Sequence, residues 1–571
     1  MRKIRLWCLI AASCLLLGNA EPVYSTGGSD LRADQIENLA RFGKIWGFLK
    51  YHHPAFTRGD LNWDEFVLDR LPIVLDASNR EQGLKLLAVW ARELADTGFC
   101  EAEASDEVHP TPNSAWITDS NELGHDLSSM LECLSLDGVP TQRYVSQQSG
   151  VGNPVFGAEE GYADVESLDW RYRLLALYRF WNIVEYWFPY RDQIDKNWDD
   201  VLVESIVAFY AATDPADYIL ELMALVAKVN DGHANLWSSI QAQPPTGVAN
   251  IPYVIRFVED RAVVWKVRSV RGGIDRIEVV NELQIGDVIL SVGGETVESM
   301  VERSSPYYGA SNRVALLRNI AVNLLRGPAG PVRLTVERAG AVRDVNTERI
   351  PRQTLDMAVG FSSDRDGDTL QTLAGDIAYL KLSSINQEDI SKYVTAALES
   401  NGLIIDLRGY PSAFVVFALG QHFIAAPTEF VRFTQGDLAS PGAFHWGPPL
   451  SLEPAEPYYG GRIVILVDEF TQSQAEYIAM AFRAAANAIV MGSQTAGADG
   501  NLSKIPLPGG HEAAISGIGV FYPDKTPTQR IGIVPDVEVS PTIAGIRDGR
   551  DEVLEFAIEH LANDSFEKKR D

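Results

Sequence analysis

The chain has little cysteine, no excess of positive charge and no metal-binding cysteine or histidine pattern. Four of its 571 residues are cysteine, and two of these, Cys8 and Cys14, lie within the first twenty residues. Because no cysteine and histidine spacing typical of a zinc site is present, we expect no metal and no other cofactor. The net charge of −28 argues against binding to nucleic acid or to an anionic membrane surface, since both select basic patches.

The first twenty residues have the order of a secretory signal. Basic residues at positions 2, 3 and 5 precede an apolar run over 6–17, and small residues follow at 18–20. No other segment has the length of a membrane span. We therefore predict a signal peptide over 1–20 and export, to a bacterial periplasm. The alternative is a membrane anchor formed by an uncleaved or lipidated N-terminus.

Only Cys100 and Cys133 remain in the exported part of the chain. An oxidising compartment would let them pair, and two buried free thiols are the alternative. Cys133 lies within, and Cys100 just before, a segment, 101–163, that is rich in serine, glycine, aspartate, asparagine and proline. This composition predicts an irregular segment that the cysteine pair holds in place.

An internal repeat precedes and follows this segment. The matched positions, each 135 apart, are Trp46 and Trp181, Tyr51 and Tyr186, Pro54 and Pro189, Trp63 and Trp198, and Asp96 and Asp231. Both copies have helical periodicity and end their first helix at a proline. We interpret the repeat as a duplicated N-terminal helical module, with the first copy in 21–165 and the second in 166–248.

The two copies differ after the last matched aspartate. The first continues with Thr97, whereas the second continues with Gly232 and His233. A histidine that occurs in only one copy, just past a helix end, is a candidate catalytic base. The alternative is a helix C-cap in which the histidine bonds the last carbonyls of the helix.

Residues 249–350 contain short apolar runs typical of strands. The phrase from Leu283 to Val297 resembles a PDZ domain, in which Gly286 and Asp287 open a strand and Gly293 and Gly294 turn into the next. A generic small β-barrel is the alternative. PDZ domains bind an extended peptide as an added strand.

Residues 351–545 alternate strand and helix patterns, which predicts a mostly parallel sheet covered by helices. The buried-strand pattern of Ile463–Val467 is followed by helical periodicity from Ala475 onward. Ser473 therefore lies at a strand-to-helix junction, where backbone N–H groups are free to stabilise an oxyanion. The alternative is a helix cap, with Glu476 completing a capping box. Residues 546–571 are expected to form a C-terminal helix and tail.

Taken together, these phrases resemble the tail-specific, or C-terminal-processing, serine proteases, in a tricorn-core-like branch and an exported bacterial subgroup. The phrases that carry the resemblance span 231–233, 283–297, 403–409, 473–476, 495–497 and 532–536, in the family's order. The resemblance implies a multidomain α+β protein. Its protease core would have the α/β fold of the ClpP and crotonase type, next to the helical module and the PDZ-like domain.

The resemblance implies that Ser473 is the nucleophile. In the processing branch a lysine about two dozen residues later is the base, but here Ala498 occupies that region and Lys504 comes too late. The tricorn branch uses a histidine, and His233 matches its position. The family's supporting glutamate is missing or moved, because Gln529 stands near its place. Asp524 and Glu512 are the substitutes that we consider.

For the oxyanion hole the resemblance implies backbone N–H groups of Gln474, Gly409 and the nearby Ser412. We therefore predict an exported serine endopeptidase in which His233 is the general base. Its partners would be protein or peptide substrates, held by their C-termini in the PDZ-like groove. The alternative is an inactive protease fold that binds peptides or small apolar ligands.

Overall fold

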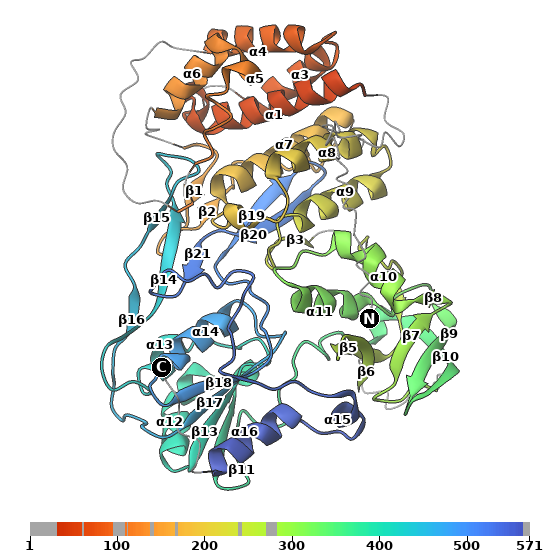
Figure 1. Cartoon of the computed structure of the whole chain (residues 1–571), viewed down its shortest axis with the longest axis vertical. Coiled ribbons are helices and arrows are strands. Elements are labelled where there is room, and N and C mark those ends of the chain that lie inside the picture. The colour runs from red at the N-terminus through yellow and green to blue at the C-terminus, as the bar shows by residue number, and fades with distance from the viewer. Residues whose placement is uncertain are drawn as a thin grey trace, which may run out of the picture.

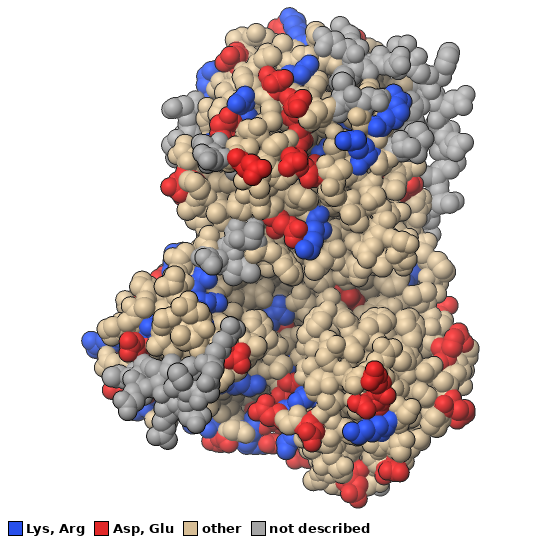
Figure 2. Space-filling model, turned by 180° about the vertical axis from the view of Figure 1, so that it is seen from behind, with Lys and Arg blue, Asp and Glu red and all other residues tan. Residues whose placement is uncertain are grey.

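The computed structural model describes residues 31–59, 62–94, 109–110, 112–136, 142–165, 169–237, 242–269 and 282–563. The expected signal peptide and Cys100 lie outside these residues. A helical part lies above two further parts, a β-rich part and a larger α/β core (Figure 1). From behind, the surface is hollowed between the two lower parts (Figure 2). Across the described residues, no helix combines the length and apolarity that a membrane crossing requires.

The first helical segment packs around a pair of tryptophans. Its helices are α1 (Ala33–His52), α2 (Pro54–Thr57), α3 (Trp63–Leu75) and α4 (Arg80–Leu94). The rings of Trp46 and Trp63 stack with centroids 6.1 Å apart. Each indole N–H donates to the other residue's backbone carbonyl, at 3.1 and 2.9 Å. Asn62 caps α3 by accepting the N–H groups of the first turn.

The second helical segment has the same internal contacts. Its helices are α7 (Trp170–Trp187), α8 (Trp198–Ala211) and α9 (Pro215–Ala227). Trp181 and Trp198 stack with centroids 6.3 Å apart, and their indole N–H groups donate to each other's carbonyls at 2.6 and 3.1 Å. Asn197 caps α8 as Asn62 caps α3.

The segment between them is more regular than its composition predicted. It contains α5 (Ser120–Leu123), α6 (His125–Leu136), β1 (Ser146–Gln147) and β2 (Pro154–Val155). The prediction of an irregular segment was wrong for α6, because Leu127 and Leu131 repeat at helical spacing and are buried on one face. Cys133, on α6, is disulfide-bonded.

The β-rich part holds the four strands that the apolar runs predicted, β5 (Tyr253–Val258), β6 (Arg261–Val267), β7 (Val288–Val292) and β9 (Gly330–Arg338). It also contains β4 (Ala249–Asn250), β8 (Glu295–Thr296) and β10 (Ala341–Pro351), with helices α10 (Val297–Ser304) and α11 (Arg313–Asn323). The described strands pair in the order β4-β10-β9-β7-β6-β5, which leaves β5 at an edge. Helix α11 packs beside β5.

The α/β core has the predicted parallel sheet. Its order is β11 (Leu370–Leu373), β12 (Ile377–Lys381), β13 (Gly402–Asp406), β17 (Ile463–Val467), β18 (Ala488–Gly492) and β22 (Val537–Glu538). All pairings from β12 to β22 are parallel, and only β11 pairs in the opposite sense. The helices of the core and C-terminal region are α12 (Ile390–Leu398), α13 (Val416–Gly420), α14 (Gln474–Arg483), α15 (Ile543–Arg547) and α16 (Glu552–Ala562).

Strands outside this sheet join the core to the helical part. They are β14 (Thr428–Gly436), β15 (Phe444–Trp446), β16 (Leu450–Leu452), β19 (Leu502–Leu507), β20 (His511–Ser516) and β21 (Gly519–Phe521). Strand β3 (Asn235–Leu236), which follows α9 and His233, pairs with β20. This pairing fixes the end of the second helical segment against a strand that follows the core sheet in the chain.

Candidate active site

Ser473 lies in a strained turn between β17 and α14. Its φ is +57° and its ψ is −122°, whereas a helix N-cap residue normally has an extended backbone. Positive φ is uncommon for a residue other than glycine, and it costs free energy that the surrounding structure must supply. A serine on a strained strand-to-helix turn is the arrangement that exposes the nucleophile of hydrolases.

Glu476 anchors this turn from the first turn of α14. Its carboxylate accepts the Ser473 N–H at 3.2 Å, as the capping-box alternative requires. It also accepts the N–H groups of Gly497 and Ala498, at 2.8 and 3.0 Å, and the hydroxyl of Thr495. Burial raises the pKa of Glu476. Its role therefore extends beyond a cap, because it holds the 495–498 loop against the serine.

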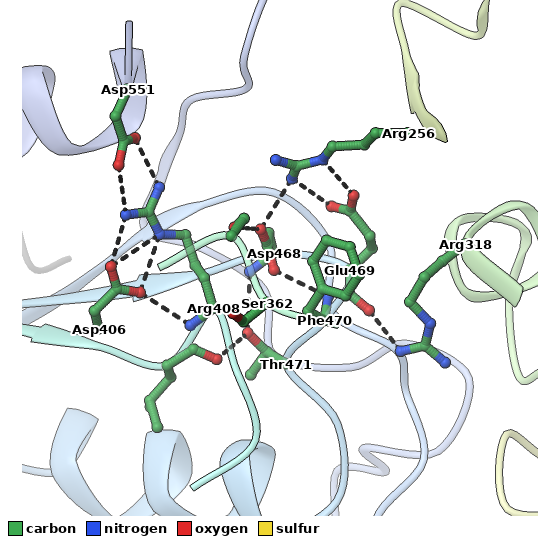
Figure 3. Close-up of polar contacts among 12 residues, drawn as sticks. Arg256, Arg318, Ser362, Asp406, Arg408, Asp468, Glu469, Phe470, Thr471 and Asp551 are labelled. Carbon is green, nitrogen blue, oxygen red and sulfur yellow. Dashed lines mark hydrogen bonds and ion pairs between the residues drawn. The ribbon is translucent and has the colours of Figure 1, made fainter. Parts of the chain in front are cut away.

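Two arginines of the β-rich part bond to residues that come shortly before Ser473, and Figure 3 shows both of them beside Asp468 and Glu469. Arg256, on β5, pairs with Asp468 at 2.9 Å and with Glu469 at 2.6 Å. Arg318, on α11, donates to the Glu469 carbonyl and to the Gln472 side-chain oxygen, both at 2.7 Å. The residues that lead into the nucleophile turn are thus bonded to a separate part of the chain.

The loop after α9 packs against the residues that flank Ser473. Gln472 donates its side-chain N–H to the Gly232 carbonyl at 3.2 Å. A Cβ on Gly232 would lie 2.8 Å from the Ala498 Cβ, and the Ala498 carbonyl accepts the Ser473 N–H at 2.9 Å. Because the Ala498 Cβ lies this close to Gly232, a longer side chain such as lysine at position 498 would collide with the loop that carries His233.

His233 belongs to a buried chain of hydrogen bonds. Its Nδ1 lies 2.9 Å from Ser516 Oγ on β20, and Ser516 Oγ donates to Asp231 Oδ1 at 3.1 Å. The Asp231 carboxylate also accepts the N–H groups of His233 and Ser516, and the Gln529 side-chain N–H at 3.2 Å. Burial lowers the pKa of His233, while the charge of Asp231 opposes that shift.

This chain of bonds assigns a tautomer to the imidazole. Since the Ser516 hydroxyl donates its one hydrogen to Asp231, it accepts a hydrogen from His233 Nδ1. Nε2 then carries the lone pair that a general base needs. The ring contacts β20 rather than a carbonyl of α9, which differs from the expected geometry of the C-cap alternative.

The structure does not bring the considered substitute acids to His233. Asp524 lies exposed in a turn, where its carboxylate accepts the Thr526 N–H at 2.9 Å. Glu512 pairs with Lys504 at 2.8 Å, and more than half of the Lys504 side chain is exposed. The carboxylate near the histidine is Asp231, from the same phrase of the chain.

Sequence reasoning missed Ser516 as a partner of His233. A serine on a strand 43 positions beyond Ser473 carries no motif that would distinguish it from other serines. Gln529, which stands near the place of the family's glutamate, donates to Asp231 and so contributes to the same cluster.

The three predicted oxyanion donors differ in their surroundings, and for Gln474 and Gly409 the role stays a prediction. The Gln474 N–H opens α14 and so lacks an intrahelical acceptor, and its side chain holds the Ala413 carbonyl at 2.9 Å. Gly409 allows close packing, because a Cβ there would lie 2.8 Å from the Ser362 Cβ. Ser412 is corrected: its N–H already donates to the Leu382 carbonyl at 3.1 Å, which leaves it no hydrogen for an oxyanion.

Residues 376–539 match the family model of peptidase family S41, so the chain carries a peptidase family S41 domain. The predicted resemblance to C-terminal-processing proteases is confirmed by a curated relative, the carboxy-terminal-processing protease of Bartonella bacilliformis. It is 24% identical over 246 residues, which cover 41% of this chain and 53% of the relative. The chain therefore matches about half of that relative's length.

Solved structures share the fold. Mature CPAF aligns with a TM-score of 0.53 and 15% identity, over 70% of this chain and 99% of CPAF. A serine-to-alanine mutant of CPAF aligns with a TM-score of 0.54 at the same identity and coverage. At this level of identity the likeness concerns the fold alone.

Proposed function

We propose that the protein is a serine endopeptidase that cleaves protein or peptide substrates, with Ser473 as nucleophile and His233 as general base. The observation that carries this proposal is the strained Ser473 turn, flanked by the loop that holds the Asp231–Ser516–His233 hydrogen-bond chain. Membership of the matched domain in a peptidase family supports the same conclusion.

In the proposed mechanism His233 Nε2 takes the proton of Ser473 Oγ as that oxygen attacks the peptide carbonyl. The imidazolium that forms is stabilised through Ser516 by the Asp231 carboxylate, which stays ionised. The N–H groups of Gln474 and Gly409 donate to the oxyanion, a contribution of roughly 3 kcal/mol per donor. His233 then protonates the leaving amine, and water hydrolyses the acyl-enzyme by the same steps.

We further propose that the β-rich part is a PDZ-like domain that holds a substrate C-terminus beside β5. Edge strand β5 and helix α11 border a cavity of about 330 Å³ whose apolar lining includes Val254, Phe257, Val314 and Leu317.

We also propose that the helical part is a duplicated module, which the matched tryptophan pairs support. The first twenty residues would direct the protein to export.

A fluorophosphonate probe tests the nucleophile. We expect the probe to label the wild-type chain at Ser473, as located by peptide mass spectrometry, and not to label Ser473→Ala. Ser440→Ala, which removes an exposed loop serine, is the matched control and should be labelled as the wild type is. Hydrolysis of an unfolded protein should disappear in Ser473→Ala alone. If the wild type is not labelled, the site is not an activated serine and the chain is a binding protein.

A second pair of variants tests the proposed peptide groove. Val314→Lys places a charge in the apolar cavity, whereas Val342→Lys changes an exposed position on β10. We expect Val314→Lys to raise KM for a protein substrate and to leave cleavage of a short peptide unchanged. Equal loss for both substrates would assign the β-rich part a structural role.

A further inference from the structure

A cavity of about 560 Å³ opens beside Ser473. Ser473 borders it together with Gln474, whose N–H is a proposed oxyanion donor. Most of the remaining wall is aromatic or aliphatic, and its rings belong to Tyr410, Phe414, Phe417, Phe433 and Tyr477. Tyr410, Phe414 and Phe417 are about half-exposed. Exposed apolar side chains that gather in one place mark an interaction site, and a largely apolar cavity with a few polar groups is typical of a ligand pocket.

The aromatic wall begins one helical turn after the nucleophile. Tyr477 lies four residues after Ser473, on α14, and its ring stacks on those of Phe414 and Phe433 with centroids 6.0 and 6.1 Å apart. The Phe414 ring in turn lies 6.1 Å from the Phe417 ring. Aromatic pairs at such distances stabilise one another beyond the area that they bury. The rings therefore form one continuous surface next to Ser473.

The loop that carries Phe414 is held in place by the protein itself. Gln474 donates its side-chain N–H to the Ala413 carbonyl at 2.9 Å, which ties the loop to the first turn of α14. On the other side, the Ser412 hydroxyl donates to the Ile385 carbonyl at 2.6 Å. A pocket whose wall is already ordered loses less conformational entropy when a side chain enters it.

The helical part supplies one edge of this pocket. Gly150 and Val151, from the turn between β1 and β2, border the cavity. The Val151 carbonyl accepts the Gln435 side-chain N–H from β14 at 2.9 Å. A Cβ on Gly152 would lie 2.5 Å from the same nitrogen of Gln435, so the turn packs directly on β14. The pocket is therefore assembled from the core and from the segment between the two helical copies.

The one charged residue among the described residues of this wall, Asp499, is not available to a substrate cation. It is 5% exposed, its Oδ1 accepts the Gly500 N–H at 2.8 Å, and its Oδ2 is buried without a hydrogen-bond partner among the described residues. Burial also raises the pKa of Asp499 well above its usual range, which favours an uncharged carboxyl. A lysine or arginine side chain in the cavity would lose hydration without gaining an ion pair.

Building on the proposed function, we propose that this cavity is the specificity pocket for the substrate residue whose carbonyl is attacked, and that it selects a large apolar side chain such as that of phenylalanine. A carbonyl placed at Ser473 Oγ and the Gln474 N–H lies at the edge of the cavity, because both residues border it. The side chain of the same substrate residue is then the nearest group that can enter. A benzyl group would cover the exposed rings, whereas the methyl group of alanine would leave them in water.

Peptides that differ at one position test this selection. Each carries phenylalanine, leucine, alanine or lysine within an otherwise fixed sequence of glycine and serine with the same C-terminus, and mass spectrometry identifies the cleaved bond. For the wild type we expect kcat/KM for cleavage after phenylalanine to exceed the values for alanine and lysine by roughly tenfold or more. A single methylene in an apolar pocket is already worth about 10- to 200-fold in discrimination. Leucine should give an intermediate value.

Two variants change the wall in opposite ways. Phe414→Ala removes a ring, and Val151→Phe adds one from the helical side. Each should lower the ratio of phenylalanine to alanine cleavage by about tenfold, the first through lost contact and the second through lost space. Phe556→Ala, at an exposed position of α16, and Val342→Phe, at an exposed position of β10, are the matched controls and should keep the wild-type ratio.

The wild-type measurement does not depend on how the variants fold. A ratio of phenylalanine to alanine cleavage of one or less, or cleavage that requires phenylalanine after the bond instead of before it, would overturn the specificity proposal and leave the proposed function intact. A wild-type ratio in both Phe414→Ala and Val151→Phe would overturn the assignment of this cavity. Absence of cleavage of every peptide, together with absence of fluorophosphonate labelling, would instead overturn the proposed function itself.

Discussion

The two helical segments share their local structure and differ in what they deliver. In each, two tryptophans 17 positions apart stack and exchange indole hydrogen bonds with backbone carbonyls. After the last helix, the second segment continues through His233 into β3, which pairs with the core. Two segments with the same local structure can therefore differ in that only one of them is followed by a candidate catalytic histidine.

The first segment shares a buried ion cluster with the second. Lys50 on α1 bonds Glu159 at 2.5 Å, and neither side chain is exposed. Arg179 on α7 pairs with Glu159 at 2.9 Å and with Asp64 at 2.5 Å. Arg179 also donates to the Pro506 carbonyl of β19. This cluster joins both helical segments to the core, and the proposed mechanism does not use it.

The largest effect is expected from His233→Ala. Removal of the proposed base should lower the rate of peptide hydrolysis by roughly 10²- to 10⁴-fold, because general acid–base groups typically contribute this much. The melting temperature should change little, since the loop is also held by Gly232 and Asp231. Steady-state kinetics on a fluorogenic peptide provides the measurement.

Lys504→Ala is the matched control for His233→Ala. Lys504 pairs with Glu512 on the surface, so its loss should change the rate by no more than about twofold. A large loss in Lys504→Ala with little effect in His233→Ala would restore a serine–lysine mechanism.

Glu159→Gln should instead damage stability. Removing one partner of a buried pair leaves Lys50 unpaired and costs about 3–5 kcal/mol in the free energy of unfolding. Urea denaturation measures this loss. Glu81→Gln, which breaks the exposed pair with Lys85, should leave the free energy of unfolding nearly unchanged. A loss of activity without a loss of stability in Glu159→Gln would show that the cluster acts on the site.

Much of the difference between the two helical segments could be predicted from the sequence. The constant spacing of the tryptophans, the strand pattern of Ile463–Val467 and the phrase around His233 are local signals, and the structure places each as a helix, strand or loop accordingly. Helix α6 escaped notice because polar residues obscured its leucine periodicity. Composition is thus a weaker guide than spacing.

The partners of the site could not be predicted in the same way. Ser516 reaches His233 only because β20 pairs with β3, and this pairing joins residues almost 280 positions apart. Asp499 becomes notable only when the structure shows that its Oδ2 is buried without a partner among the described residues. Both depend on tertiary contacts that leave no local pattern.

Ser516→Ala tests the chain of bonds that distinguishes the second segment. Loss of the hydroxyl removes the link between His233 and Asp231, so kcat should fall by roughly 10- to 100-fold with little change in KM. Ser516→Thr, which keeps a hydroxyl, should restore most of the rate. If both variants lose activity and stability alike, Ser516 is a packing residue and not a positioning residue.

A smaller, paired effect is expected from the tryptophans. Trp63→Phe and Trp198→Phe, at matched positions, each remove one indole N–H and its hydrogen bond to a buried helix carbonyl, at a cost of about 0.5–1.5 kcal/mol. Because the two pairs have the same geometry, the losses measured by urea denaturation should agree within about 1 kcal/mol. A much larger loss in Trp198→Phe would show that the segment bearing His233 is more tightly coupled to the rest of the fold.

The smallest effect concerns the pH dependence of hydrolysis. The base must be neutral, and an unperturbed histidine of pKa about 6.5 would leave roughly a quarter of the maximal rate at pH 6. Burial lowers the pKa of His233, so the rate should hold to lower pH and its acid limb should lie below 6.5. In Ser516→Ala the link to Asp231 is lost, so the limb should move lower still while the maximum falls. Profiles of kcat/KM between about pH 4.5 and pH 8 measure the acid limb of the wild type and that of Ser516→Ala. An acid limb above 6.5 would contradict a buried histidine as the base.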